Sequence, residues 1–201
     1  MPLRATFSAA LVDLKRALKA RDWSLIGAQV ATIYGSTRTT QDIDLSVFLD
    51  PKHWPELVQD LLDAGFIARI PDALEFAERT RVLLLQHQAS EVDIDLVLAG
   101  PGLETLFLGR KVTVPVFDLA VPVLCVEDLI ASKVFAGRPR DLDDLRAVLR
   151  RTPFVAQNVV ETLRLLESAL DRSDLVSCFH ALQDDLGLRR GKSNHASDDS
   201  R

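Results

Sequence analysis

Short apolar runs separated by polar breaks occupy the first part of the chain, whereas apolar residues at helical spacing dominate the last third. Apolar side chains at positions 7, 10, 11, 14 and 18 recur every three or four residues, which predicts an amphipathic helix over residues 6–20. The runs WSLI, DIDLSVFLD, RVLLLQH and EVDIDLVLAG are short and apolar, and they predict β-strands. KVTVPVFDL predicts a further short strand at a sheet edge, because Pro115 cannot donate a ladder hydrogen bond.

Helices are predicted between several of these strands. A glycine turn at Gly27 opens a helix of small residues that stops at Gly35. A second helix runs from about residue 53 to residue 64, and Gly65 is its C-terminal stop. Residues 72–80 have a weaker helical pattern. The front of the chain is therefore expected to form a mixed sheet backed by helices.

The pattern changes at Cys125. Helical spacing continues from there to residue 151 but breaks at Gly137 and Pro139, which predicts two helices that meet at a bend. PFVAQNVVETLRLLESALD and DLVSCFHALQDDLG predict one long and one shorter helix, and the polar end RRGKSNHASDDSR predicts a disordered tail. The expected fold class is α+β, a small mixed β-sheet core backed by helices and followed by a C-terminal helical bundle. Its expected parts are a core built around the sheet (1–122), a helical part packed on that core (123–188) and the tail (189–201).

Composition narrows the class of protein. With 201 residues and 47% apolar content, the chain is long enough for a compact domain with its own core. No uncharged apolar run reaches about eighteen residues and the start lacks a signal-peptide core, so a cytoplasmic protein without a membrane partner is expected. Two distant cysteines and four scattered histidines fit neither a disulfide framework nor a zinc site. Any metal would be bound by carboxylates.

Charge bears on the choice of partner. The formal net charge of −5 argues against a general grip on nucleic acid, which needs a positive surface. Residues 133–151 are locally rich in lysine and arginine, only partly offset by aspartates. This segment fits either a basic binding face or a solvated helix surface with local ion pairs.

Two pairs of aspartates interrupt the predicted strands. Asp42 and Asp44 are one residue apart, so their side chains point to the same face of a strand, roughly 6.5 to 7 Å apart. Asp93 and Asp95 repeat the arrangement. If the two strands are neighbours, three or four carboxylates gather on one face, where they would repel one another unless a cation intervenes. The alternative is that each pair is the charged solvent face of an edge strand.

The carboxylate arrangement favours magnesium and a nucleoside triphosphate. Mg²⁺ takes oxygen ligands, commonly one or two carboxylates completed by water and substrate phosphates. Two ions about 3.5 to 4 Å apart can activate an attacking oxygen and stabilise a leaving group. The sequence therefore predicts a two-metal site, with Mn²⁺ as a possible substitute.

Three segments resemble one known family. The stretch from Gly27 to Leu45 resembles the signature of the nucleotidyltransferase superfamily related to DNA polymerase beta, although Ala28 stands where that family usually has glycine or serine. YGSTRTTQDIDL is similar to the AbiEii-type branch, which includes toxins of bacterial toxin–antitoxin and phage-defence systems. VDIDLVLAGPGLE resembles the strand that carries the third carboxylate, and PVLCVEDLIASKVFAGRPRDLDDLRAVL resembles the lysine-containing helix and its continuation.

The resemblance assigns roles to individual residues. Asp42 and Asp44 match the metal-binding pair, and Asp95 matches the third carboxylate, with Asp93 as the competing assignment. Gly27 matches the turn glycine, whose helix N-terminus can receive phosphate.

Other matching positions concern the nucleotide. Ala28 follows the turn glycine, and Arg38 and Lys133 match basic positions near the triphosphate. Arg38 could instead pair with one of the aspartates, and Lys133 could be an ordinary surface lysine. Asp141 and Asp144 match a helix pair that could orient Lys133 or the arginines, and they rank lower, as does Arg138.

The activity implied by the resemblance is transfer of a nucleoside monophosphate from a nucleoside triphosphate to an acceptor hydroxyl. The AbiEii-type branch favours RNA as the acceptor, with the 3′ end of tRNA as the first choice, and a cognate antitoxin protein as a partner. Two other readings stay open. One is modification of a small molecule of the antibiotic type or of a protein, and the other is a non-catalytic nucleotide-binding regulator or antitoxin-like partner.

Overall fold

The computed structural model describes residues 3–19 and 21–188, so the predicted tail at 189–201 lies outside the described residues. The chain divides into two compact units. The sheet unit contains the described residues up to Ile33 together with residues 38–125. The helical unit contains the short segment Tyr34–Thr37 and the described residues from Val126 onward.

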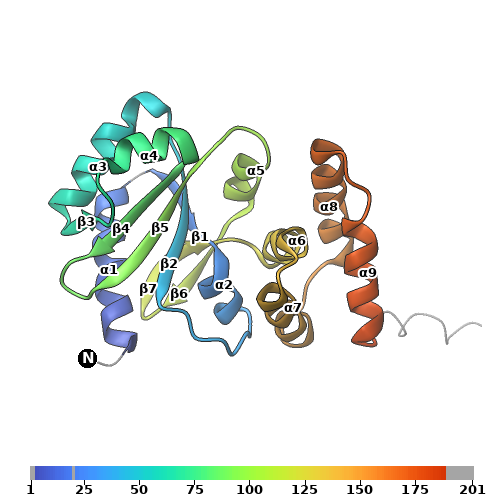
Figure 1. Ribbon diagram of the computed structural model, residues 1–201. Coiled ribbons are helices and arrows are strands. Elements are labelled where there is room, and N and C mark those ends of the chain that lie inside the picture. Colours follow the sequence, from blue (N-terminus) through green and yellow to red (C-terminus); the bar gives the residue numbers. More distant parts are fainter. Residues whose placement is uncertain (1–2, 20, 189–201) are drawn as a thin grey trace, which may run out of the picture. The chain divides into compact units, whose positions relative to one another are not determined.

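A seven-stranded mixed sheet forms the centre of the sheet unit, with strand order β3-β4-β5-β2-β1-β7-β6 (Figure 1). β2 pairs in parallel with β5, β1 pairs in parallel with β7, and the other neighbours are antiparallel. β6 lies at one edge, as predicted from Pro115. The strands are β1 (Asp22–Leu25), β2 (Asp42–Phe48), β3 (Phe66–Ala68), β4 (Val82–His87), β5 (Val92–Ala99), β6 (Val112–Val116) and β7 (Leu119–Val123).

Helices cover both faces of this sheet. Alternate residues of β2, namely Ile43, Leu45 and Val47, are fully buried on one face. His87 belongs to the same layer and reaches α1, where its Nε2 lies 3.0 Å from Asp13. Figure 1 shows α1 and α3 on one side of the strands and α2 and α5 on the other. The helical elements of this unit are α1 (Leu3–Leu18), α2 (Gly27–Ile33), the 3₁₀ turn η1 (Pro51–His53), α3 (Trp54–Asp63), α4 (Ala73–Thr80) and α5 (Leu103–Arg110).

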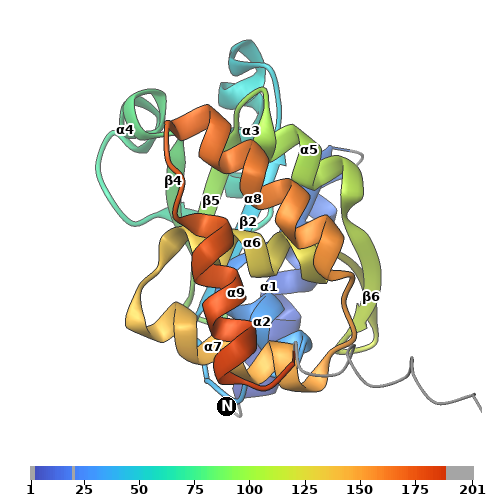
Figure 2. The same ribbon diagram turned by 90° about the vertical axis from the view of Figure 1, so that its right-hand side faces the viewer.

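The helical unit contains α6 (Val126–Ala136), α7 (Pro139–Arg151), α8 (Ala156–Leu170) and α9 (Leu175–Asp185) (Figure 2). α6 contacts each of the other three helices. The predicted bend between the first two is confirmed, because Gly137 adopts a positive φ of 60° and Pro139 opens α7. Fully buried residues include Ile130, Leu145, Val159, Leu163 and Phe179.

Three elements were not predicted, and each is short. β3 has three residues, β7 contains a proline, and α5 follows a glycine and has no clear apolar stripe. Such segments are stabilised by neighbours rather than by their own pattern. Among the described residues, no helix is both long enough and apolar enough to cross a membrane.

Candidate active site

The two aspartate pairs lie side by side on neighbouring strands. β2 and β5 run parallel in a register that places Asp42 opposite Asp93 and Asp44 opposite Asp95. Because side chains alternate along a strand, all four carboxylates belong to the face opposite the buried Ile43. The prediction that these strands are neighbours is confirmed. Asp42 is exposed, and the other three aspartates are partly buried.

Gly27 packs directly against Asp44. Its φ of +69° lies in the left-handed region, and a Cβ atom at this position would lie 2.8 Å from Cγ of Asp44. The preceding Ile26 donates its N–H to the backbone oxygen of Asp44 at 2.9 Å. The turn before α2 therefore needs glycine because its backbone lies against the carboxylate. The phosphate contact of this turn stays a prediction.

An arginine that the sequence analysis did not identify binds the second pair of aspartates. Arg69 places Nη1 2.9 Å from Oδ2 of Asp93 and pairs through Nη2 with Oδ1 of Asp95. Gln86 donates from Nε2 to Oδ1 of Asp93 at 3.0 Å. No motif marked Arg69, because its partner residues are more than twenty positions further along the chain. Only the strand register could have revealed it.

The donor set fits a hard divalent cation. Every candidate ligand in the predicted set is a carboxylate, which is the donor that Mg²⁺ and Mn²⁺ prefer. Within residues 3–19 and 21–188, no three His, Cys, Asp or Glu side chains are arranged to hold a metal ion. The side chains of Asp93 and Asp95 are turned towards Arg69 instead. The backbone register thus aligns the donors, while the arginine binds two of them.

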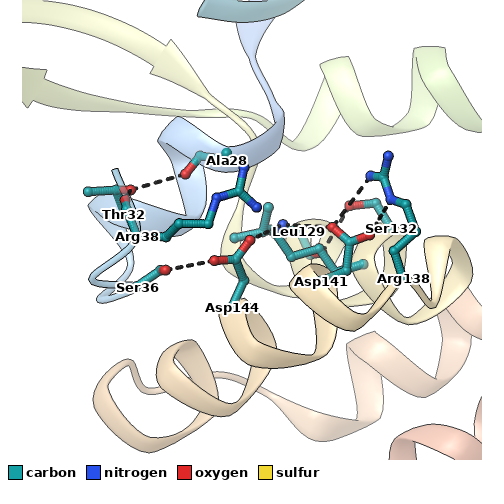
Figure 3. A network of polar contacts seen from close by, with 10 residues as sticks. Ala28, Thr32, Ser36, Arg38, Leu129, Ser132, Arg138, Asp141 and Asp144 are labelled. Atoms are coloured by element: carbon teal, nitrogen blue, oxygen red, sulfur yellow. Dashed lines mark hydrogen bonds and ion pairs between the residues drawn. The ribbon is translucent and has the colours of Figure 1, made fainter. Parts of the chain in front are cut away.

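Arg38 lies in the loop between α2 and β2. Its backbone oxygen and that of Ala28 both lie 3.1 Å from the hydroxyl of Thr32, whose single proton can serve one of them at a time (Figure 3). The contact between Thr32 and Arg38 ties the middle of the loop to α2. The nucleotide contacts predicted for Ala28 and Arg38 stay predictions.

The remaining predicted residues form an ionic cluster in the helical unit, in which Lys133, Asp141 and Asp144 are buried and Arg138 is exposed. Lys133 of α6 is 5% exposed, and its Nζ lies 3.1 Å from Oδ1 of Asp141 and 2.7 Å from Oδ2 of Asp144. Arg138 adds an ion pair to Asp141, and Ser36 donates its hydroxyl to Oδ1 of Asp144 at 2.7 Å (Figure 3). Buried charges of this kind persist when each one is paired and hydrogen-bonded. Lys133 is therefore not an ordinary surface lysine.

The cluster affects the protonation of Asp141 and holds the loop around Ser36. Burial alone would raise the pKa of Asp141, but hydrogen bonds from Arg138 and Lys133 outweigh burial and hold this pKa below its ordinary value. Ser36, which no predicted role singled out, is buried and hydrogen-bonded to α7. The neighbouring Gly35 also has a structural reason, since a Cβ there would lie 2.9 Å from Cβ of Arg151.

The candidate residues thus fall into two groups. The sheet unit brings together Gly27 and the four aspartates, and the helical unit brings together Lys133, Arg138, Asp141 and Asp144 with Ser36. An ammonium group has three protons, and two of those on Lys133 are directed to aspartates. Its predicted contact with a triphosphate stays a prediction.

One protein family resembles this chain in sequence, and several solved structures resemble it in fold. The family model described as nucleotidyl transferase AbiEii toxin, type IV toxin–antitoxin system, matches residues 9–193. A candidate nucleotidyltransferase from Helicobacter pylori has a TM-score of 0.51 at 13% identity, over 98% of this chain and all of that one. The lincosamide antibiotic adenylyltransferase LnuA, solved with lincomycin, has a TM-score of 0.50 at 14% identity, over 76% of this chain and 98% of its own. At such identities these structures show the fold alone. No curated protein matches the sequence.

Proposed function

Because the chain belongs to the AbiEii nucleotidyltransferase toxin family, we propose that this transferase moves a nucleoside monophosphate from a nucleoside triphosphate to an acceptor hydroxyl. The observation that supports the proposal is the register that aligns Asp42 and Asp44 with Asp93 and Asp95. The acceptor oxygen forms a bond to the α-phosphorus, and the bond from that phosphorus to the oxygen of the leaving pyrophosphate breaks. The proton of the hydroxyl passes to the carboxylate of Asp95.

Asp42, Asp44 and Asp95 are the proposed ligands of two magnesium ions, which manganese could replace. Bound Mg²⁺ supplies positive charge that stabilises the phosphate oxygens as the bond order changes. The protein contributes position and electrostatics. One pair of parallel strands sets the spacing of the carboxylates, and the missing Cβ of Gly27 leaves room for the side chain of Asp44. Arg38 is proposed to contact the triphosphate.

The proposed acceptor is RNA, with the 3′ end of tRNA as its most favoured site. The family description as a toxin of a toxin–antitoxin system supports this acceptor, and it supports a cognate antitoxin protein as a partner. The exposed side chains of Arg140 and Arg150 in α7 are available to contact the phosphate backbone of RNA.

A hydroxyl of a small molecule is the second candidate acceptor, and one observation favours it. Lys133, Arg138 and Arg146 of the basic segment each form an ion pair with an aspartate of the same unit. Together with the net charge of −5, these pairs leave little excess positive charge for a phosphate backbone.

Labelled nucleoside triphosphates, offered one at a time with Mg²⁺ and total tRNA, test the proposal. The wild type should label tRNA with at least one of the four nucleotides, and the double variant Asp42→Asn/Asp44→Asn should not. Asp63→Asn is the matched control, because it removes an exposed carboxylate of α3 whose side chain accepts a hydrogen bond from Gln59.

Salt and a second set of acceptors separate the candidates. Binding of tRNA should weaken steeply as salt rises, whereas a small neutral acceptor would be nearly indifferent to it. Labelling that appears only with hydroxyl-bearing antibiotics would favour the second candidate. Equal, background labelling by wild type and double variant across all acceptors would contradict nucleotidyl transfer and favour a nucleotide-binding regulator.

A further inference from the structure

Arg69 is the one arginine of the described residues whose guanidinium bridges two carboxylates of β5. Its side chain is 27% exposed, and those of Asp93 and Asp95 are 35% and 38% exposed, so the ion pairs are partly shielded from water. A guanidinium group stays protonated under all ordinary conditions and presents a planar fork of donors. The guanidinium of Arg69 is therefore a permanent positive charge on the face that carries the aspartates.

Strand register explains how the side chain reaches these partners. Arg69 directly follows β3 and donates its N–H to Leu84 O of β4 at 3.0 Å, which continues the β3–β4 ladder by one residue. Leu84 is paired with Asp95, and Asp95 is paired with Asp44. The four residues form one row across the sheet. Arg69 spans β4, roughly 10 Å from strand to strand, to reach β5.

The two aspartates use the arginine differently. Both oxygens of Asp93 are engaged, one by Arg69 and one by Gln86. Asp95 gives only Oδ1 to Arg69, and in the described part of the chain its Oδ2 accepts no hydrogen bond. Asp93 and Gln86 thus hold the guanidinium, and the guanidinium in turn fixes one oxygen of Asp95. This asymmetry distinguishes the two aspartates, which the sequence could not.

We propose that Arg69 is a positioning residue that orients Asp95 and, as a built-in counter-cation, competes with a divalent metal for the carboxylates of β5. The inference rests on the proposed function for the identity of Asp95 as a metal ligand and proton acceptor. Asp93 is then the anchor of Arg69, and Asp95 is the carboxylate that keeps an oxygen for the metal. A guanidinium beside a metal site opposes binding of the bare ion and at the same time restrains the ligand that turnover needs.

The first test measures Mn²⁺ binding to the full chain without nucleotide, by the loss of the paramagnetic resonance signal of the free ion. Arg69→Met should bind Mn²⁺ about fivefold more tightly than the wild type, the size expected when one partly exposed opposing charge is removed. Arg79→Met is the matched control, because it removes an arginine from an exposed pair with Glu75. It should leave Mn²⁺ affinity unchanged.

The second test measures kcat for nucleotidyl transfer in the same variants. Arg69→Met should lower kcat although it binds the metal better. Arg69→Lys should restore the lower Mn²⁺ affinity without restoring the planar fork that holds Asp93 and Asp95 together. If Arg69 had only a structural role, Arg69→Met would instead bind Mn²⁺ more weakly and would also be less stable than the wild type.

The outcomes separate the two proposals. Unchanged or weaker Mn²⁺ binding by Arg69→Met overturns the role of Arg69 while leaving nucleotidyl transfer by the wild type intact. Tighter Mn²⁺ binding by Arg69→Met supports that counter-cation role even if the wild type transfers no nucleotide, in which case the proposed function fails on its own.

Discussion

The backbone of Gly27 lies against the carboxylate of Asp44, close enough that any Cβ atom on Gly27 would overlap that side chain. The contact joins the turn before α2 to the strand that carries the first aspartate pair. It gives a physical reason for glycine at position 27, because the side chain of any other residue would displace that of Asp44.

Substitution of Gly27 by alanine is predicted to cost more than backbone strain. An L-residue in the left-handed region costs about 1–2 kcal/mol, and the new methyl group would also displace the Asp44 side chain. Gly187→Ala is the control, since Gly187 has a φ of +70° and no atom within 4 Å of a Cβ. Urea unfolding should show a greater loss for Gly27→Ala, and only this variant should weaken Mn²⁺ binding. Equal effects of the two variants would show that Asp44 moves aside without cost.

Lys133 is predicted to be needed for stability. Lys133→Met would leave Asp141 and Asp144 buried without their shared cation, and removal of one partner from a buried ionic cluster costs about 3–5 kcal/mol. Arg146→Met removes a cation from an exposed pair with Asp143 and should cost at most about 1 kcal/mol. Chemical denaturation of both variants measures the difference. A Lys133→Met protein that is as stable as the wild type but inactive would instead favour direct contact with the triphosphate.

The elements with a strong hydrophobic pattern could be predicted from the sequence. The alternation in DIDLSVF and VDIDLVLA predicted two strands with aspartates on a common face, and the parallel register confirms that they are neighbours. Local sequence could not predict that Arg69 bridges Asp93 and Asp95, because the bridge depends on how β3, β4 and β5 align.

The segment around Ser36 was missed for a related reason. A glycine–serine–threonine loop has no periodicity, and the partners of Ser36 and Gly35 lie more than a hundred residues further along, in α7. Polar loop residues look alike in sequence whether they are solvated or buried against a distant helix. The burial of Ser36 can be predicted only when the position of Asp144 in α7 is known.

Stability of the wild type is predicted to depend on Asp141 in the acid range. The pKa of Asp141 in the folded protein lies below its ordinary value of 3.8, although burial by itself would raise it, because hydrogen bonds from Arg138 and Lys133 favour the carboxylate. A depressed pKa contributes stability that is complete above the unfolded value and is lost as the pH falls through the folded value. The difference in unfolding free energy between wild type and Asp141→Asn should therefore be constant near neutral pH and shrink below about pH 4.

Asp143→Asn is the control for this pH series. Asp143 is exposed and pairs with Arg146 on the surface of α7, so its removal should change stability little at any pH. Urea denaturation at several values between pH 3 and pH 7 gives both differences. A gap between wild type and Asp141→Asn that stays constant down to pH 3 would contradict the assigned direction of the pKa shift.

Ser36→Ala is predicted to destabilise the protein through Asp144. The Ser36 hydroxyl donates to Oδ1 of Asp144 at 2.7 Å in a buried setting, and a hydrogen bond to a charged group contributes about 1.5–3 kcal/mol. Thr37→Ala alters the next, exposed residue and should change the unfolding free energy by about 0.5 kcal/mol at most. Because Ser36 and Lys133 share Asp144, the double variant Ser36→Ala/Lys133→Met should lose less stability than the sum of the single losses. Strict additivity in this cycle would mean that the two side chains stabilise the helical unit independently of Asp144.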